Sequence, residues 1–394
     1  MINKNFLKLG TARSAIRELF EYGNKQKKLL GPDKVFDFSL GNPSTPAPKE
    51  VDKAINDIIL SGNSVLTHGY TSAQGSFETR SAIANSIIKR FGVNASADDI
   101  YITCGAAAAL CCTFGALTES TDTEFIAIAP YFPEYKVFVE GQRAKLKVVP
   151  ADTKAFQIDF NALESLINEN TAGVIINSPN NPSGTVYSEE TLVKLADILN
   201  EKSREFGHTI YIISDEPYRE LVYGDIEVPF IPTIYKNTVI CYSYSKSLSL
   251  PGERIGYVFV PCFAENSAEL YAAVAGAGRA MGYVCAPSLI QAVISKCIDA
   301  KPNLEEYKVN RDLLYNTLTS YGYECASPDG AFYLFVKAPN SDGNKFSEMA
   351  KNKNVLIVSG ESFGLKEYVR ISYCVDTKTV KGALPLFKEL IKEC

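Results

Sequence analysis

The sequence predicts an α/β fold, in which a mostly parallel sheet carries helices on both faces and a smaller, discontinuous α+β domain accompanies it. The first observation is a series of short apolar runs, rich in β-forming residues and without polar alternation, which is typical of buried parallel strands: 125–129, 174–177, 209–214 and 238–243. The second is that three of the gaps between apolar runs are long enough for a crossover helix. The third is the length of 394 residues with 46% hydrophobic residues, which favours one large and one smaller domain.

The first part of the chain alternates helical and extended patterns. Helices are expected where apolar residues recur at helical spacing: 14–28, 49–60 and 76–91. A short strand is expected at 36–40, followed by GNPSTPAP (41–48), where three prolines forbid regular structure and whose composition also suits an inter-domain linker. A loop is expected at 68–75. A strand over 99–103 then runs directly into a poly-alanine segment that predicts a helix.

The second part of the chain contains one predicted change of strand direction. Ser188 is placed to cap a helix that ends at Gly207. No room for a crossover helix remains between Ser243 and the apolar run 255–260, so that strand is expected to be antiparallel. Two helices and three strand-containing segments complete the pattern: 289–300, 304–321, 328–336, 355–358 and 369–373.

Composition excludes several classes of function. The formal net charge of -5 and the lack of a basic block argue against nucleic acid or an anionic membrane as a partner. Ten cysteines without a CxxC pair are typical of reduced thiols in a cytoplasmic protein. No segment resembles a signal peptide or reaches the length of a transmembrane helix. Two histidines, His68 and His208, without a matching ligand cluster argue against a metal site or a Ser/His/Asp triad.

The stretch SYSKSLSLPGERIGY, from Ser243 to Tyr257, contains the strongest candidate for chemistry. Lys246 lies among three serines, including Ser245, and Arg254 follows it. A lysine amine can form a Schiff base with a carbonyl, and an arginine fork suits a phosphate. The combination describes a seat for a phosphorylated aldehyde. The alternative is a polar turn with a solvated lysine and an arginine paired to a surface carboxylate.

Other polar residues are expected at the same edge of the sheet. Asn181, Asp215, Tyr218 and Lys246 each follow one of the predicted strands. In open α/β sheets ligands bind beyond the carboxyl ends of the strands. Because independent surface turns have no reason to place these residue types at one edge, we favour a binding site over a solvated turn.

These motifs resemble the class I/II aminotransferases, pyridoxal-phosphate enzymes of fold type I that include aspartate aminotransferase. The resemblance extends from GNPSTPAP to VRISY, nearly the whole chain. It implies a seven-stranded sheet, pyridoxal 5'-phosphate as cofactor and transfer of an amino group between an L-amino acid, of the aspartate or aromatic type, and a 2-oxo acid. It also implies a homodimer with shared active sites. The expected domains are an N-terminal part of the small domain (1–45), a cofactor-binding domain (46–298) and a connecting helix with the C-terminal small domain (299–394).

The resemblance implies roles around the cofactor ring. Lys246 would form the Schiff base and afterwards act as general acid and base. In the motif SDEPY, Asp215 would pair with the pyridine nitrogen and Tyr218 with the phenolic oxygen. Asn181 of SPNNPSG would also bind the phenolic oxygen, and Phe132 of PYFPEY would stack on the ring.

The resemblance also implies a phosphate site. Ser243, Ser245 and Arg254 would contact the phosphate, together with backbone amides at a helix start where alanines replace the hydroxyl of some relatives. The residues of that helix start are Gly105, Ala106 and Ala107. Tyr70 would reach the phosphate of the neighbouring subunit.

For the substrate, Arg370 in VRISY resembles the arginine that holds the α-carboxylate, assisted by Asn181 and the Gly41 amide. Arg279 lies near a position where some relatives place a second cation, contributed across the dimer, although its register is off by about two residues in the motif and a structural or surface role is the alternative. Two other functions are also compatible with these residues. One is a carbon–sulfur β-lyase of the same fold, and the other is a non-catalytic cofactor-binding regulator.

Overall fold

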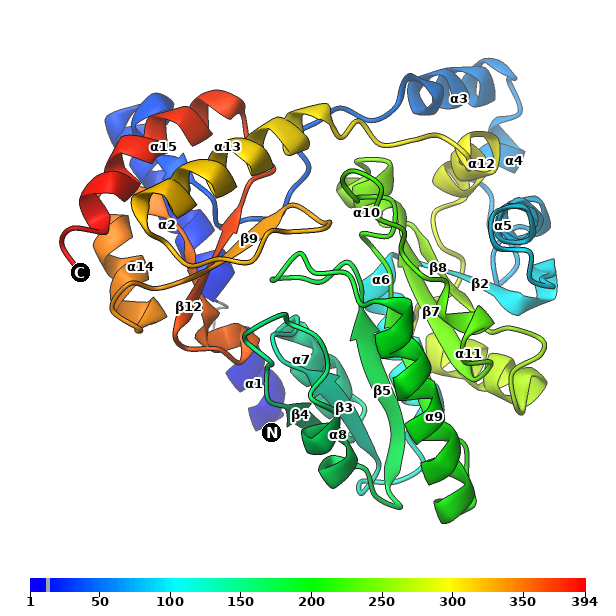
Figure 1. Cartoon of the computed structure of the whole chain (residues 1–394). Helices are drawn as coiled ribbons and strands as arrows, with labels where there is room; N and C mark the ends of the chain where they lie inside the picture. The colour runs from blue at the N-terminus through cyan, green and yellow to red at the C-terminus, as the bar shows by residue number, and fades with distance from the viewer. Residues whose placement is uncertain (12–14) are drawn as a thin grey trace.

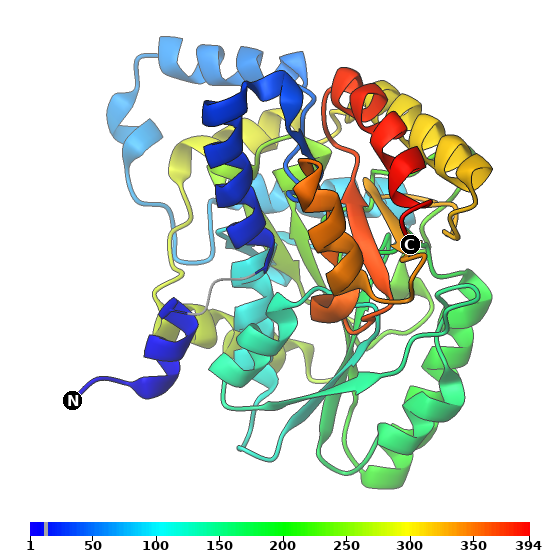
Figure 2. The same ribbon diagram turned by 90° about the vertical axis from the view of Figure 1, so that its left-hand side faces the viewer.

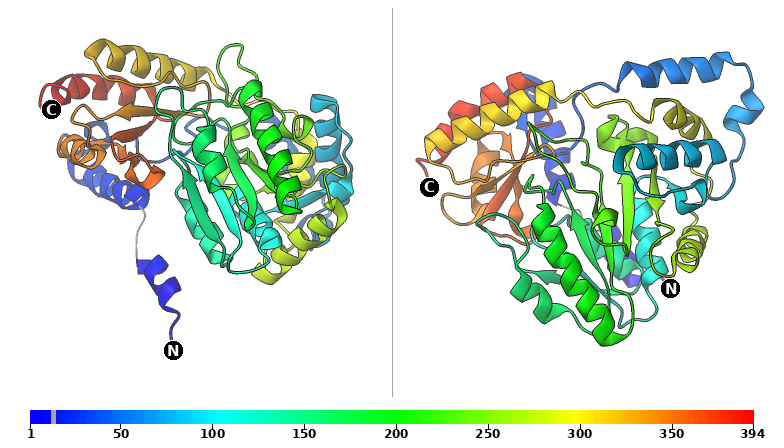
Figure 3. Two further views of the ribbon diagram at one scale, coloured as in Figure 1. Left: turned by 60° about the horizontal axis from the view of Figure 1, so that its bottom comes forward. Right: turned by 45° about the vertical axis from the view of Figure 1, so that its right-hand side comes forward.

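The computed structural model describes residues 1–11 and 15–394 (Figure 1). Ser14, where the first predicted helix was expected to begin, lies outside these residues. The helix itself is α2 (Ala15–Leu30). It is preceded by α1 (Lys4–Thr11), which buries none of its residues and stands apart from the rest of the molecule in the left view of Figure 3.

A seven-stranded sheet forms the centre of the molecule, as the fold class predicted. Its strand order is β2-β8-β7-β6-β5-β3-β4. All neighbouring strands are parallel except at β8, which runs antiparallel to both β2 and β7, as the short connection after Ser243 predicted. The strands are β2 (Ile100–Thr103), β3 (Glu124–Ile128), β4 (Lys145–Val149), β5 (Thr171–Asn177), β6 (Tyr211–Asp215), β7 (Thr238–Ser243) and β8 (Gly256–Phe259).

Three details of the strands differ from the prediction. Strand β4 was not predicted, because its sequence KLKVV carries lysines and it lies at the partly exposed edge of the sheet. The connection from β6 to β7 contains a single 3₁₀ turn, η3 (Ile231–Thr233), where a crossover helix has room. The strand expected at 36–40 is shortened to β1 (Phe36–Asp37).

Helices cover both faces of the central sheet (Figure 1). Alternate residues of a strand face opposite sides, so Phe125 packs in a cluster with α6, α7 and α11, whereas Ile126 packs with α8 and α9. Helices α3, α5 and α12 pack together with β2, β7 and β8. The bounds are α3 (Lys49–Leu60), α4 (Ser64–His68), α5 (Phe77–Phe91), α6 (Ala106–Leu117), α7 (Glu134–Gly141), α8 (Phe160–Leu166), α9 (Glu189–Phe206), α10 (Tyr244–Ser247), α11 (Ser267–Met281) and α12 (Ser288–Cys297).

Helix α9 begins and ends where its sequence signals predicted. The hydroxyl of Ser188 accepts a hydrogen bond from the Thr191 amide at 3.1 Å, which satisfies an otherwise unpaired donor of the first turn. Gly207 ends the helix with φ of 74°, a left-handed conformation that glycine adopts without strain.

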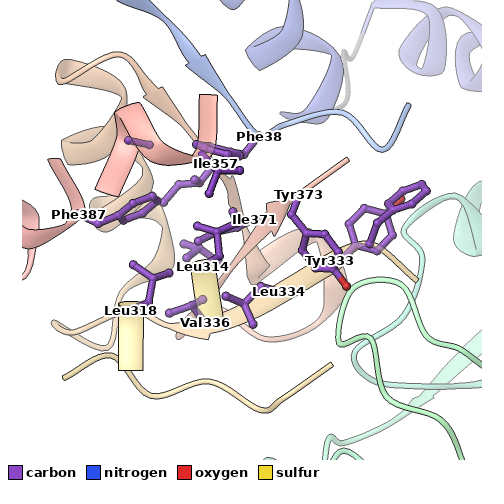
Figure 4. Packing of buried hydrophobic residues seen from close by; sticks show 14 of the residues in the cluster. Phe38, Leu314, Leu318, Tyr333, Leu334, Val336, Ile357, Ile371, Tyr373 and Phe387 are labelled. Atoms are coloured by element: carbon purple, nitrogen blue, oxygen red, sulfur yellow. The ribbon is translucent and has the colours of Figure 1, made fainter. Parts of the chain in front are cut away.

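Two small sheets and four helices pack beside the large sheet. One small sheet is antiparallel, in the order β11-β12-β9, and the other pairs β1 with β10 in parallel. Figure 4 shows the shared apolar cluster, in which Phe38 from the start of the chain meets Phe387 near its end. The remaining elements are β9 (Tyr333–Lys337), β10 (Val355–Leu356), β11 (Val358–Ser359), β12 (Tyr368–Ser372), α13 (Glu305–Tyr321), α14 (Gly343–Asn352) and α15 (Thr377–Leu390).

Helix α2 brings the N-terminal segment back onto this part of the molecule. Figure 2 shows α2 beside α14, and Lys351 of α14 lies 5.0 Å from the ring centroid of Tyr22 in α2. The domain boundaries after residues 45 and 298 stay a prediction. Within the described part of the chain, no helix combines the length and apolarity needed to cross a membrane.

Candidate active site

A cavity of about 520 Å³ opens at the carboxyl ends of β5, β6 and β7. This volume lies within the range of small-molecule sites, and the position is the one where open α/β sheets bind ligands. The start of α6, strands β9 and β12, and helix α2 complete its walls. Twelve of the residues proposed from the sequence line it: Gly41, Ala106, Ala107, Phe132, Asn181, Asp215, Tyr218, Ser243, Ser245, Lys246, Arg254 and Arg370.

Lys246 points into this cavity from the short helix α10. Its Nζ donates a hydrogen bond to the Gly41 carbonyl at 2.7 Å and lies 5.6 Å from the centroid of the Phe332 ring. Desolvation by burial is the main cause that lowers the pKa of Lys246 to about 8; the positive charges of Arg254 and Arg370 act in the same direction, and Cys374 opposes them. The amine is therefore available as a nucleophile or base at a pH far below that of an exposed lysine.

One end of the cavity gathers donors suited to a phosphate. Gly105 precedes α6 with φ of 86°, and a Cβ at this position would lie 3.0 Å from Nη2 of Arg254. The guanidinium therefore approaches the start of the helix closely, where the first amides, including that of Ala106, have no partner within the helix. Oγ of Ser243 and Oγ of Ser245 lie 2.8 Å apart at the end of β7. Together these groups favour a dianion.

Asp215, the last residue of β6, lies buried at the other end of the cavity. Its Oδ2 accepts a hydrogen bond from the hydroxyl of Tyr135 at 2.6 Å, and its backbone oxygen accepts one from Nδ2 of Asn177 at 2.9 Å. Its Oδ1 is buried and has no hydrogen-bond partner among the described residues. Burial raises the pKa of Asp215 to about 7, while the bond from Tyr135 opposes the rise. A cation placed at Oδ1 would stabilise the ionised form.

Arg370 on β12 supplies a buried positive charge. Nη1 donates to Oδ1 of Asn181 at 3.0 Å and Nη2 donates to the Ser39 carbonyl at 2.6 Å. The guanidinium lies 4.6 Å from the ring centroid of Tyr333 and 5.0 Å from that of Phe363. Its Nε has no partner among residues 1–11 and 15–394, and burial lowers the pKa of Arg370. A buried guanidinium whose hydrogen bonds in the described chain go to an amide and a carbonyl oxygen, and not to a carboxylate, suits an anionic ligand.

Arg17 of α2 lines the cavity and was not predicted from the sequence, and four further unpredicted residues contact the predicted ones. They are Tyr135, which bonds Asp215; Asn177, which accepts from the Asn181 amide at 2.7 Å; Tyr333, whose hydroxyl lies 2.8 Å from that of Tyr218; and Phe332 under Lys246. Asn177 ends a predicted buried strand, and a polar residue there is a signal that could have found it. The others act through contacts with distant segments, for which the sequence gives no signal.

Tyr70 and Arg279 do not line the cavity of this chain. The side chain of Tyr70 is 97% exposed, and Arg279 is exposed in the last turn of α11. Both were expected to act across a dimer, so their roles stay predictions. Among the described residues no group of three or more His, Cys, Asp or Glu could hold a metal ion.

Comparisons with known proteins all lead to aminotransferases. The family model described as aminotransferase class I and II matches residues 33–385. The chain belongs to this family. An aspartate aminotransferase from Pyrococcus horikoshii is 30% identical over 94% of this chain and 93% of its own length. Aromatic-amino-acid aminotransferase 2 from Thermococcus litoralis is 27% identical over 96% of both chains. The crystal structure of an amino transferase from Eubacterium rectale is 58% identical, with a TM-score of 0.98 over 100% of this chain and 99% of that one.

This protein is therefore a transaminase. Enzymes of this class, such as aspartate aminotransferase, use pyridoxal phosphate. The residues present fit that cofactor. The unpartnered Oδ1 of Asp215 offers a place for a protonated ring nitrogen, and the close approach of Arg254 to Gly105 forms a cradle that a Cβ would fill. The reactive amine of Lys246 lies in the same cavity.

Proposed function

We propose that this aminotransferase moves an amino group between an L-amino acid, of the aspartate or aromatic type, and a 2-oxo acid. The observation that carries the proposal is that one cavity joins the low-pKa amine of Lys246, the buried guanidinium of Arg370 and the unpartnered oxygen of Asp215. Relatives named for aspartate and for aromatic amino acids support this choice of donor.

In this proposal Lys246 attaches the cofactor through Nζ. Asp215 pairs with the ring nitrogen, Tyr218 and Asn181 face the phenolic oxygen, and Phe132 stacks on the ring. The phosphate is held by the group described at the start of α6 and the end of β7: Gly105, Ala106, Ala107, Ser243, Ser245 and Arg254. When bound, the cofactor supplies an electron-withdrawing ring that stabilises negative charge on the substrate carbon that loses its proton.

Nζ of Lys246 is the group that moves this proton. Its pKa of about 8 is close to the operating pH of most enzymes, which is the condition for efficient general acid–base catalysis. The hydrogen bond to the Gly41 carbonyl at 2.7 Å and the Phe332 ring beside Nζ restrict where the amine can lie.

Arg370 binds the substrate α-carboxylate, with the Gly41 amide and Asn181 beside it. Gly41 lies against Tyr333 so closely that a Cβ at this position would overlap the tyrosine hydroxyl, so the backbone approaches the site where a side chain has no room. Arg17 of α2 also lines the cavity. We assign Arg17 to the side-chain carboxylate of a dicarboxylic substrate because it lines the same cavity as Arg370.

The proposal includes a homodimer with shared active sites. Tyr70 would reach the phosphate in the neighbouring subunit, and Arg279 would contribute to the neighbouring substrate site. Tyr70 is 97% exposed, and the short segment that precedes it also exposes Leu60, Val65 and Leu66. Exposed apolar side chains in such number are typical of an interaction surface.

A complementation experiment tests the shared site. Neither the Lys246→Ala nor the Tyr70→Ala homodimer should form a complete site. In a hybrid dimer, the chain that keeps Lys246 would receive an intact Tyr70 from its partner. Mixing the two variants under conditions of subunit exchange should therefore restore activity, up to one site per hybrid. If hybrid dimers form but no activity returns, the shared site is contradicted.

The reaction type is tested by the requirement for an acceptor. Exchange of amino groups between aspartate, or phenylalanine, and 2-oxoglutarate is the expected result, and omission of the 2-oxo acid should limit the reaction to one turnover per cofactor. Continuous release of pyruvate and ammonia from cystathionine without an acceptor would replace the transaminase assignment with a β-lyase.

A further inference from the structure

A second cavity, of about 280 Å³, lies behind the helix that carries Lys246. Successive residues of α10 face different cavities. Ser245 and Lys246 line the active-site cavity, whereas Tyr244 and Ser247 line the second one. The second cavity therefore shares a wall with the active site but takes no part in the roles assigned above.

Three tyrosines form the inner wall of this second cavity. The ring centroids of Tyr242 and Tyr257 lie 5.0 Å apart in a stacked arrangement, and the Tyr244 ring meets that of Tyr242 at 5.0 Å edge to face. The Tyr242 hydroxyl donates to Oε2 of Glu220 at 2.8 Å and lies 3.0 Å from Oγ of Ser247. This hydroxyl is therefore satisfied by the protein.

The hydroxyls of Tyr244 and Tyr257 are not satisfied in this way. Their residues are only 4% and 8% exposed, and neither makes a hydrogen bond to any residue that the structure describes. Both interact electrostatically with Glu220 and Arg90, which also line the cavity, so the two hydroxyls face the same polar end. Burial raises the pKa of Tyr244 and of Tyr257, so both remain hydrogen-bond donors. Neither hydroxyl oxygen is among the fully enclosed atoms of the described chain that lack a partner, so both open onto the cavity and can donate to a ligand bound there.

The charge of the lining favours an anion. Arg90 donates through Nη2 to Oε1 of Glu220 at 2.9 Å, which leaves its other donors available, and its side chain is 39% exposed. Nζ of Lys89 lies 2.7 Å from Oδ2 of Asp299, so the charges of this ion pair cancel. Lys301 also lines the cavity. Three cations and two carboxylates leave one positive charge.

The remainder of the cavity is apolar. Ile83 and Ile87 of α5 face Ile298 and Pro302, which follow α12. A volume of about 280 Å³ holds roughly nine water-sized groups, at about 30 Å³ for each. The site thus suits a ligand of about ten non-hydrogen atoms with one charged and one apolar end.

We propose that this cavity is a second ligand site, which binds a small monocarboxylate with an aromatic or branched apolar group. The carboxylate accepts hydrogen bonds from Arg90, Tyr244 and Tyr257, and the apolar group packs against Ile83. The proposal does not depend on the amino donor or on the roles assigned in the active site.

The probe for this site is 4-bromobenzoate, soaked into crystals of the holoenzyme. The anomalous signal of bromine is expected between Ile83 and Tyr257. The neutral isostere 4-bromobenzamide should give no signal there, because Arg90 then has no anion to hold. A bromine signal from 4-bromobenzoate that appears only beside Arg370 in the active site would overturn the proposal.

Calorimetric titration of the holoenzyme with 4-bromobenzoate separates the two sites in solution. Tyr257→Phe removes only a hydroxyl without a partner, so it should fold normally and weaken the second site roughly tenfold or more. Ile83→Trp should fill the cavity and abolish this binding event. A melting curve and the basal activity serve as controls for both variants. Unchanged binding in both would contradict the proposal.

Discussion

The protonation of Asp215 should couple the stability of the cofactor-free enzyme to pH. Burial raises the pKa of this carboxyl from 3.8 to about 7, so the native state binds a proton more tightly than the unfolded chain does. The resulting stabilisation is fully present below about pH 4 and is lost as the pH rises through about 7. A shift of about three units, at about 1.4 kcal/mol each, amounts to roughly 4 kcal/mol.

The perturbation is Asp215→Asn, which removes the ionisable group but retains an oxygen that can accept from Tyr135. The free energy of unfolding of the cofactor-free wild type should fall relative to that of the variant between about pH 4 and pH 7, by up to roughly 4 kcal/mol. Urea unfolding of both proteins over this range measures the difference. A difference that stays constant with pH would refute the reasoning.

Two controls identify the cause of this dependence. Tyr135→Phe removes the hydrogen bond that lowers the pKa of Asp215, so the transition should move to higher pH. Saturation with pyridoxal phosphate should reduce the dependence, because a protonated ring nitrogen at Oδ1 would keep the carboxyl ionised.

The other predictions concern the cations of the cavity. Lys246→Ala should still bind pyridoxal phosphate but lose measurable turnover, and appreciable turnover would refute its role. Arg370→Ala removes charge-assisted hydrogen bonds of about 1.5–3 kcal/mol and should lower kcat/KM roughly tenfold to a hundredfold or more for every donor; equal values would exclude the role. Arg17→Met should reduce kcat/KM for aspartate more than for phenylalanine, and equal reductions would argue against the assigned side-chain contact. Arg254→Met removes a charge that lowers the pKa of Lys246, so cofactor attachment, followed by absorbance across pH, should require higher pH than in the wild type.

The parts of the site that lie on strand ends could be predicted from the sequence. Asp215 and Lys246 follow buried apolar runs, and parallel strands place such positions at one edge of the sheet. The antiparallel direction of β8 followed in the same way from the short connection after Ser243. These inferences need only local sequence and the geometry of a parallel sheet.

The remaining parts depend on how distant segments pack. Tyr135 reaches Asp215 across 80 positions, and Tyr333 meets Tyr218 across 115, so neither contact leaves a local pattern. Strand β4 was missed because its exposed edge tolerates lysines that a buried strand does not. The roles proposed for Tyr70 and Arg279 would need a second subunit and rest on resemblance, and the complementation experiment tests that of Tyr70.

The central claim is that pyridoxal phosphate is attached to one particular amine. Reduction of the holoenzyme with borohydride, followed by mass spectrometry of its peptides, tests this directly. The pyridoxyl phosphate mass is predicted on the peptide that contains Lys246 and on no other lysine. A stable adduct elsewhere, or a protein that takes up no cofactor, would contradict the account.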